Sequence, residues 1–348
     1  MKILIATDAW EPQVNGVMRT LQATVLELRQ RGHGVRIVHP EDFQTIAMPT
    51  YPDIRLAVAT ASAMRPILAK EQPDAIHIAT EGPIGWAMRQ ACLSSQQRFT
   101  TSYHTRFPEY ISARVPVPEW MTYAMLRHFH TPAAHVMVST PSMRAVLAGH
   151  GFRNLVHWPR GVDTGLFRPD HPSVLDLPRP IFLTVSRLAV EKNIEAFLSL
   201  DLPGSKVVVG DGPQADALRS RFPTAHFMGL KQGSALAAIY ASADVFVFPS
   251  RTDTLGLVNL EALACGTPVA AYPVRGPLDI LGFDGCGLHR GGEAIGALDK
   301  DLGEAIRRAL AVNRNACARE AAFYSWDACT DAFERGLALP SRRMRVAA

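Results

Sequence analysis

Short apolar runs alternate with stretches of helical length, and this alternation occurs twice along the chain. In the first half the apolar runs are residues 2–7, 34–40, 54–60, 74–80, 98–104 and 135–140. A second series follows at residues 180–186, 206–210, 225–229, 244–250 and 267–273. Strands that alternate with helices form parallel crossover units. The sequence therefore predicts an α/β protein with two doubly wound parallel sheets.

A segment rich in glycine and proline, residues 160–180, separates the two series and is predicted to be the linker between two domains. A chain of 348 residues exceeds the usual size of one hydrophobic core, which favours two domains of roughly 170 residues each. After the second series, residues 302–314 and 315–337 are predicted to be helical. In such a pair of sheets a ligand is expected near the carboxyl ends of the strands.

Composition excludes several classes of protein. With 47% hydrophobic and 20% charged residues, the chain is typical of an ordinary globular protein. The five cysteines are scattered, which predicts neither a disulfide framework nor a zinc site. The opening apolar run soon reaches Asp8, and no run is long enough to span a membrane, so we expect a cytoplasmic or peripheral protein.

Positive charge is concentrated in the first half. Residues 1–168 hold 17 Lys and Arg against 12 Asp and Glu, whereas the remaining 180 residues hold 19 against 20. This imbalance suits a phosphorylated acceptor or an anionic membrane surface, although a chance imbalance on a solvated face gives the same numbers. No basic stripe interleaved with aromatic residues is present, so nucleic acid is not expected as a partner.

Two carboxylates lie eight residues apart at a predicted strand-to-helix turn. Asp253 follows the apolar run 244–250, and Glu261 lies within a predicted helix that runs from Gly256 to Ala264. The unpaired N–H groups and the dipole of the first helical turn favour a bound diphosphate. Glu261 lies about two turns further on, so the two acids would address different parts of one ligand. An N-cap at Asp253 and a solvated Glu261 are the simpler alternatives.

Cations occupy a second strand-to-helix turn. Arg187 and Lys192 follow the apolar run 180–186, where they are placed to hold a diphosphate leaving group. Taken alone, two such residues are more often surface residues. The Gly-Asp-Gly sequence at residues 210–212 predicts a tight turn with positive backbone angles. Asn15 and Gly16 form a turn at a helix N-terminus that suits phosphates, although an ordinary connection has the same pattern.

These motifs together resemble the retaining glycosyltransferases of family 4, which have the GT-B fold. Residues 250–273 resemble the E-x7-E signature of that family, with Asp253 in place of the first Glu. Residues 186–193 resemble its G-R-L-x-x-E-K-N motif, and residues 159–170 resemble its linker. The resemblance implies two Rossmann-like domains, 1–165 and 166–324, that face each other across a cleft. It also implies that residues 325–348, with Trp326 and Phe333, cross back to the first domain.

The resemblance also assigns roles to individual residues. The catalytic residues that it implies are His104, Arg187, Lys192 and Asp253. The residues that it implies for the nucleotide and the donor sugar are Asn15, Gly16, Gly229, Leu230, Gly256, Leu257, Val258 and Glu261. Within this set, Glu261 would bind the ribose and the amides after Gly256 the diphosphate. Acceptor contacts are expected, from the end of another predicted strand and the loop beyond His104, at Glu81, Gly82 and Arg106.

The expected function is transfer of a hexose from a nucleoside-diphosphate sugar to an acceptor hydroxyl, with retention of the anomeric configuration. The resemblance favours GDP-mannose as donor, with UDP-glucose next, and a glycolipid, a lipid-linked sugar or a polysaccharide as acceptor. Because two cations would neutralise the diphosphate, no metal and no cofactor are expected. The alternatives are a non-catalytic subunit that binds a sugar nucleotide and a sugar-nucleotide epimerase. The helix predicted at residues 119–130, with Trp120 and Met121, suits a core face or a membrane surface.

Overall fold

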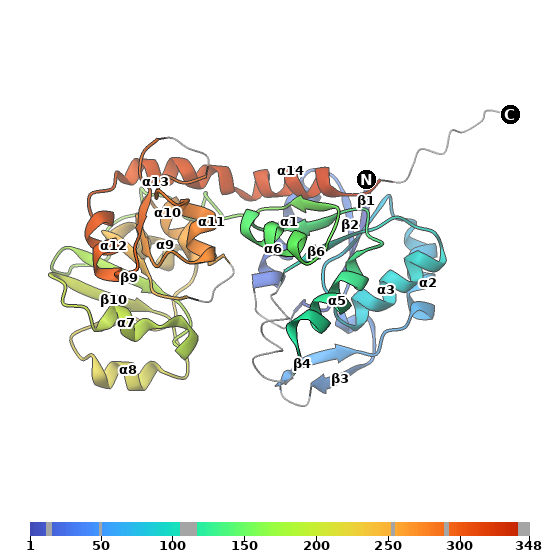
Figure 1. Ribbon diagram of the computed structural model, residues 1–348, viewed down its shortest axis with the longest axis horizontal. Coiled ribbons are helices and arrows are strands. Elements are labelled where there is room, and N and C mark those ends of the chain that lie inside the picture. The colour runs from blue at the N-terminus through green and yellow to red at the C-terminus, as the bar shows by residue number, and fades with distance from the viewer. Residues whose placement is uncertain (12–15, 49–50, 105–116, 252–254, 289–291, 340–348) are drawn as a thin grey trace. The chain divides into compact units, whose positions relative to one another are not determined.

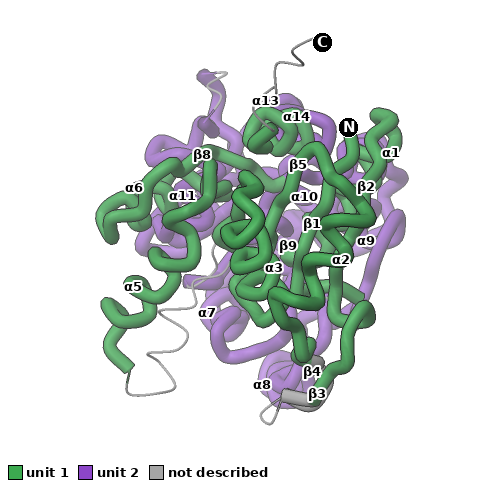
Figure 2. Tube along the Cα trace, turned by 90° about the vertical axis from the view of Figure 1, so that its right-hand side faces the viewer, with its two compact units in different colours: residues 1–160, 329–348 green, residues 161–328 purple. Residues whose placement is uncertain are grey.

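The computed structural model describes residues 1–348 except 12–15, 49–50, 105–116, 252–254, 289–291 and 340–348. The chain forms two compact units, which Figure 2 distinguishes by colour. Unit 1 comprises residues 1–160 and the C-terminal segment from Cys329, and unit 2 comprises residues 161–328. The boundaries expected from the sequence, after residues 165 and 324, lie a few residues from these.

The elements of unit 1 alternate along the chain as predicted (Figure 1). In chain order they are β1 Lys2–Ala6, α1 Gly16–Gln30, β2 Gly34–Val38, η1 Pro40–Asp42, β3 Thr45–Met48, β4 Tyr51–Ala57, α2 Ala61–Glu71, β5 Ala75–Ile78, α3 Pro83–Ser94, β6 Thr100–Tyr103, α5 Glu119–His130, β7 Val136–Val138, α6 Pro141–Gly149 and β8 Leu155–His157.

Six of these strands form one parallel sheet in the order β2-β1-β5-β6-β7-β8. The chain first builds outward from β1 to β2 and then crosses to the other side of β1 with β5. One prediction was wrong: the apolar run at residues 54–60 does not join this sheet. Its strand, β4, pairs with β3 in a separate antiparallel pair, because an intervening short strand offers a hairpin partner along the chain.

Unit 2 repeats the alternation. In chain order its elements are β9 Ile181–Val185, η2 Val190–Lys192, α7 Ile194–Leu198, β10 Ser205–Val209, α8 Ala215–Arg221, β11 His226–Phe227, α9 Gly233–Ser242, β12 Val245–Phe248, α10 Leu257–Ala264, β13 Val269–Ala271, α11 Arg275–Leu281, β14 Gly296–Leu298, α12 Leu302–Ala309, α13 Arg314–Ala321, η3 Ala322–Tyr324 and the start of α14 Trp326–Gly336.

The sheet of unit 2 is also parallel, in the order β11-β10-β9-β12-β13-β14. Its strands read as continuous apolar runs because both faces are covered. Alternate residues of β9 show this: Ile181 and Leu183 belong to the core on one face, and Phe182 belongs to the core on the other. Two parallel α/β sheets are the fold class that the sequence predicts.

The C-terminal helix α14 is divided between the two units. Its first residues belong to unit 2, and from Cys329 onward it packs with unit 1 (Figure 2). There Phe333 lies against Trp158 and His77, with ring centroids 5.0 and 4.9 Å apart. Glu334 pairs with Arg31 of unit 1 at 2.9 Å. No helix in the described part of the chain is long and apolar enough to cross a membrane.

Candidate functional site

The sheet of unit 2 reverses its direction of growth between β9 and β12. Strands β10 and β11 extend the sheet on one side of β9, and β12 then continues it on the other side. At such a point the loops after two neighbouring parallel strands diverge, and ligands of open α/β sheets bind there, at the carboxyl ends of the strands. The predicted turn with Arg187 follows β9, and the turn before Gly256 follows β12. The topology therefore brings the two predicted motifs to one edge.

The turn after β9 presents Arg187 as an exposed side chain. A Gly-Asp-Gly turn after β10 packs against this segment. The amide of Leu188 donates to the Asp211 carbonyl at 2.9 Å, and a Cβ atom at Gly210 would lie only 1.9 Å from the Ser186 carbonyl oxygen. Gly210 has a positive φ of 132°, as the sequence predicts for this turn. Only glycine allows the two backbone segments to approach this closely.

Lys192 ends the short helix η2, next to the loop that follows β12. Asn193, in a left-handed conformation with φ 53°, donates from Nδ2 to the Pro249 carbonyl at 3.1 Å. The Ser250 hydroxyl in turn donates to the Glu191 carbonyl at 3.4 Å. These two hydrogen bonds join the turns after β9 and β12, so Lys192 lies beside the start of the loop that leads to α10.

Helix α10 begins after Gly256, which has φ 75° and ψ 80°. A Cβ atom at Gly256 would lie 2.8 Å from Asn259 Nδ2 and 2.9 Å from Phe248 Cζ, so only glycine fits between these side chains without a shift. Leu257 and Val258, the first residues of the helix, are only partly buried. The first N–H groups of a helix lack partners within the helix, so this end suits an anion. The structure confirms the predicted short helix and its end near Gly266.

Glu261 is held by a buried tyrosine. The hydroxyl of Tyr240, in α9, donates to Glu261 Oε2 at 3.0 Å, and Tyr240 is fully buried. Burial, together with the adjacent Glu261 carboxylate, raises the pKa of Tyr240 well above its usual range. The tyrosine therefore stays protonated and fixes one oxygen of the carboxylate. Glu261 is thus partly buried and hydrogen-bonded, and the simpler alternative of a solvated surface residue does not describe it.

The segment after β11 and a third arginine or lysine side chain also lie at this edge. Gly229 follows β11 with φ 66°, its carbonyl accepts from the Gly210 amide at 2.9 Å, and Leu230 beside it is exposed. Sequence reasoning missed Arg251, whose guanidinium lies 4.1 Å from the centroid of the Tyr272 ring. Its position directly after the apolar run 244–250 was the signal that could have identified it. The edge thus carries a third cation.

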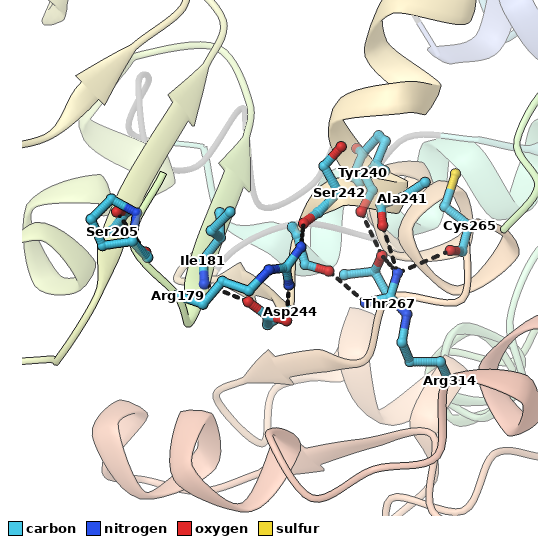
Figure 3. Close-up of polar contacts among 12 residues, drawn as sticks. Arg179, Ile181, Ser205, Tyr240, Ala241, Ser242, Asp244, Cys265, Thr267 and Arg314 are labelled. Carbon is cyan, nitrogen blue, oxygen red and sulfur yellow. Dashed lines mark hydrogen bonds and ion pairs between the residues drawn. The ribbon is translucent and has the colours of Figure 1, made fainter. Parts of the chain in front are cut away.

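A cavity of about 400 Å³ lies at the opposite edge of this sheet, where β9, β12 and β13 begin. Figure 3 shows the polar contacts of Arg179 and Arg314, which line it. Its two arginines already have protein partners. Arg314 donates to the carbonyls of Ala241 and Ala243, and Arg179 pairs with Asp244. Because ligands of such sheets bind at the carboxyl ends of the strands, we assign the site to the other edge, despite this cavity.

Unit 1 has its own reversal point, between β1 and β5. Asp8, after β1, accepts from the amides of Ile84 and Gly85 at 2.9 and 3.3 Å and from the Thr80 hydroxyl at 2.8 Å. The carboxylate thus occupies the N-terminus of α3. Burial raises the pKa of Asp8, and the neighbouring Glu81 carboxylate adds to the rise, although these hydrogen bonds oppose it.

The predicted acceptor residues Glu81 and Gly82 lie at this point. The Glu81 side chain is 4% exposed, and its Oε1 lies 3.2 Å from Nε2 of His130, a partner that the sequence did not indicate. Gly82 packs against Asp8, where a Cβ atom would lie 2.4 Å from the carboxylate carbon. Gly16 is the exposed first residue of α1.

His104 follows β6 and is enclosed by polar partners. Its Nε2 lies 2.7 Å from the Ser102 hydroxyl, and its Nδ1 is hydrogen-bonded to Nη2 of Arg160. Both ring nitrogens are therefore engaged within unit 1. Arg160 lies in the segment that sequence reasoning treated only as a linker, so this contact was not predicted.

The predicted residues fall into two groups. Unit 2 brings together, at one sheet edge, Arg187, Lys192, Gly229, Leu230, Gly256, Leu257, Val258 and Glu261. Unit 1 holds Gly16, Glu81, Gly82 and His104 at the carboxyl edge of its own sheet. Asn15, Arg106 and Asp253 lie outside the described residues. The edge in unit 2 offers cations, helix amides and a fixed carboxylate, which are the groups that bind a nucleoside diphosphate.

Both halves of the chain match models of known protein families. A model described as Glycosyltransferase Family 4 matches residues 14–166, and one described as Glycosyl transferases group 1 matches residues 179–311. A GDP-mannose-dependent alpha-mannosyltransferase of Mycolicibacterium smegmatis is 31% identical over 310 residues, which cover 81% of this chain and 82% of that protein. The chain belongs to the family 4 glycosyltransferases. A protein of the same name from Mycobacterium tuberculosis is 29% identical to this glycosyltransferase over 367 residues, covering 95% and 94% of the two chains.

The fold of the glycosyltransferase has solved counterparts. The sucrose-phosphate synthase of Thermosynechococcus elongatus matches it with a TM-score of 0.72 and 21% identity, over 96% of this chain and 97% of the other. With its two Rossmann-like units, the glycosyltransferase has the GT-B fold, as the motifs predict. The matched family models and the mannosyltransferase relatives support a nucleotide sugar as its donor, and the rival assignments, a non-catalytic subunit and an epimerase, are not favoured.

Proposed function

We propose that this glycosyltransferase transfers mannose from GDP-mannose to an acceptor hydroxyl and retains the anomeric configuration of the donor. The observation that carries the proposal is the edge of unit 2 between β9 and β12. There an exposed Arg187, the Lys192 turn, the N-terminus of α10 and the tethered Glu261 follow neighbouring strands. Two relatives named GDP-mannose-dependent alpha-mannosyltransferases support the choice of donor. UDP-glucose is the second candidate.

In the proposed mechanism the protein makes the diphosphate a good leaving group. Arg187 and Lys192 neutralise charge that develops on the diphosphate oxygens, and the amides of Leu257 and Val258 donate to the same group. Glu261, which Tyr240 holds in place, accepts from the ribose hydroxyls. With two cations on the leaving group, the reaction is proposed to need no metal. His104 and Asp253 are proposed to contact the donor sugar.

Retention follows in this proposal from attack on the face from which the diphosphate departs. The incoming hydroxyl gives its proton to a departing diphosphate oxygen, so the protein need not supply a base. His104 suits this scheme because both of its ring nitrogens are engaged by Ser102 and Arg160. Glu81 and Gly82, with Arg106, are proposed to line the acceptor position.

A lipid-linked acceptor is proposed because α5 exposes large apolar side chains. Trp120 is 68% exposed, Met121 48% and Met125 49%, and all three lie on one side of the helix. An exposed apolar helix face of this kind inserts into the interfacial region of a membrane. We therefore propose a glycolipid or lipid-linked sugar as acceptor and peripheral attachment through α5, with a soluble polysaccharide as the alternative that the experiment below distinguishes.

The proposal is tested by incubating the purified chain with GDP-mannose, UDP-glucose or ADP-glucose and following nucleotide release. Each donor is combined with anionic vesicles that carry a lipid-linked sugar or with a soluble polysaccharide. We expect fastest release from GDP-mannose with the vesicles, unchanged by a metal chelator, and a product with the anomeric configuration of the donor by proton NMR. A product with inverted anomeric configuration would contradict retention. If the protein bound GDP but cleaved none of the donors, it would be a non-catalytic binding subunit.

A further inference from the structure

Arg160 is a buried cation to which none of the described carboxylates is paired. Only 8% of the residue is exposed. Its Nη1 is buried and has no hydrogen-bond partner there. The guanidinium lies over the Trp158 ring, 5.2 Å from its centroid. Burying an unpaired charge is unfavourable by several kcal/mol in general, so Arg160 calls for a functional explanation.

Within the described part of the chain, the side chain to which Arg160 donates is that of His104. Arginine can only donate, so the Nη2 contact requires that Nδ1 of His104 carry no proton and accept. A neutral imidazole then has its proton on Nε2. That nitrogen lies 2.7 Å from the Ser102 hydroxyl, which itself donates to the Ala79 carbonyl at 3.2 Å. The chain of hydrogen bonds therefore selects one tautomer of His104.

The other groups around His104 favour the same neutral state. His77, from β5, lies 3.1 Å from the Ser102 hydroxyl through its Nε2, and burial lowers the pKa of His77 to about 3. Burial, the Arg160 charge and the neighbouring His77 and His130 all lower the pKa of His104 well below its usual range. Burial lowers the pKa of Arg160, whereas Cys329 of α14, a titratable neighbour, raises it. No described carboxylate offsets these effects at His104.

We propose that Arg160 is a positioning residue that holds His104 as the neutral tautomer with its proton on Nε2. This inference rests on the proposed function for its catalytic meaning. There, His104 contacts the donor sugar as a neutral ring, with Nδ1 accepting from Arg160 and the Nε2 proton directed to Ser102. Removal of Arg160 allows the other tautomer and the imidazolium to form, and either would present the wrong charge or proton to the sugar.

The state of the ring can be measured without any substrate. In the full-length protein labelled with ¹⁵N-histidine, long-range proton–nitrogen NMR spectra distinguish a protonated from an unprotonated ring nitrogen. We expect His104 to show an unprotonated Nδ1 and a protonated Nε2 from pH 6 to 8. In Arg160→Gln the pKa of His104 should rise by about one pH unit or more, with a mixture of tautomers. Arg160→Lys, which retains the charge and a donor, should restore much of the original pattern.

Controls separate this role from a structural one. Arg89 is also buried and donates to backbone carbonyls of Phe129 and His128, so Arg89→Gln removes a comparable arginine that does not touch His104. It should leave the His104 signals unchanged. A protonated Nδ1 in the unaltered protein, or an ordinary titration near pH 6.5, would overturn the proposal even if Arg160→Gln failed to fold. Unchanged His104 signals in a folded Arg160→Gln would also overturn it.

The catalytic part is tested by the pH profile of kcat/KM for donor turnover. The unaltered enzyme should show no loss of activity that titrates with His104 between pH 6 and 8, whereas Arg160→Gln should lose activity on the acid side of this range. If no donor is turned over, the proposed function fails, and the NMR result still decides the tautomer. A flat profile in Arg160→Gln together with the expected NMR change would show that His104 does not contribute to turnover.

Discussion

The tethered carboxylate of Glu261 permits a prediction with a defined size. The Tyr240 hydroxyl donates to Glu261 Oε2 at 3.0 Å from a fully buried position, which fixes the carboxylate that is proposed to accept from a ribose hydroxyl. A hydrogen bond to a charged group contributes about 1.5–3 kcal/mol. Glu261→Ala should therefore weaken GDP binding by about 1–3 kcal/mol, a factor of roughly 5 to 150 in Kd. Tyr240→Phe, which keeps the carboxylate but releases it, should weaken binding by about 1 kcal/mol.

Isothermal titration calorimetry with two ligands gives the decisive comparison. GDP carries both ribose hydroxyls, and 2′,3′-dideoxy-GDP carries neither. The unaltered enzyme should bind GDP more tightly than the dideoxy ligand, and this preference should be reduced in Tyr240→Phe and lost in Glu261→Ala. Tyr324→Phe is a matched control, because Tyr324 is a buried tyrosine of the same unit with Glu320 and Asp279 as its acidic neighbours. If both variants weakened the two ligands equally, Glu261 would not read the ribose.

Three further predictions follow from the same structure. Lys192→Ala should lower kcat far more than it raises the Kd for GDP-mannose, because the charge acts on the departing diphosphate; a change in Kd alone would contradict this. Gly256→Ala should destabilise the protein by about 1–3 kcal/mol in urea unfolding and weaken GDP binding, because the new Cβ atom meets its neighbours. Gly32 has a similar φ of 82° and open space around it, so Gly32→Ala should show only the smaller cost of a positive φ. Burial lowers the pKa of His77 to about 3 in the folded protein, so the unfolded chain binds an extra proton as the pH falls below about 6.5. The titration of His77 alone should therefore lower the free energy of unfolding by about 1.3 kcal/mol between pH 7 and 5.5. An equal or higher free energy of unfolding at pH 5.5 would refute this prediction.

Much of the fold could be predicted because local patterns and global topology agree. Predominantly apolar runs such as residues 181–185 have only one place in an α/β unit, between two layers of helices. The edge strand β4 could not be placed this way, because apolar alternation does not identify a strand's partner. The final helical stretch was predicted without its break. The chain leaves α13 through η3 and extends at Ser325 before α14 begins.

The candidate site was predictable where a motif is contiguous in sequence and not where it is assembled in space. Arg187, Gly256 and Glu261 each lie in a strand-to-helix turn that the sequence displays directly. The contacts of Tyr240 with Glu261 and of Arg160 with His104 join residues 21 and 56 positions apart, and no spacing rule connects them. Sequence reasoning identifies the groups that bind a ligand more readily than the side chains that hold those groups in place.

The central claim is that the donor diphosphate binds at the edge of unit 2 between β9 and β12. Hydrogen–deuterium exchange of the full-length enzyme, with and without GDP-mannose, tests it most directly. Residues 187–193 and the first turn of α10, at Leu257 and Val258, should gain protection when the donor is added. Protection that appeared instead around the cavity lined by Arg179 and Arg314, or at neither place, would contradict it.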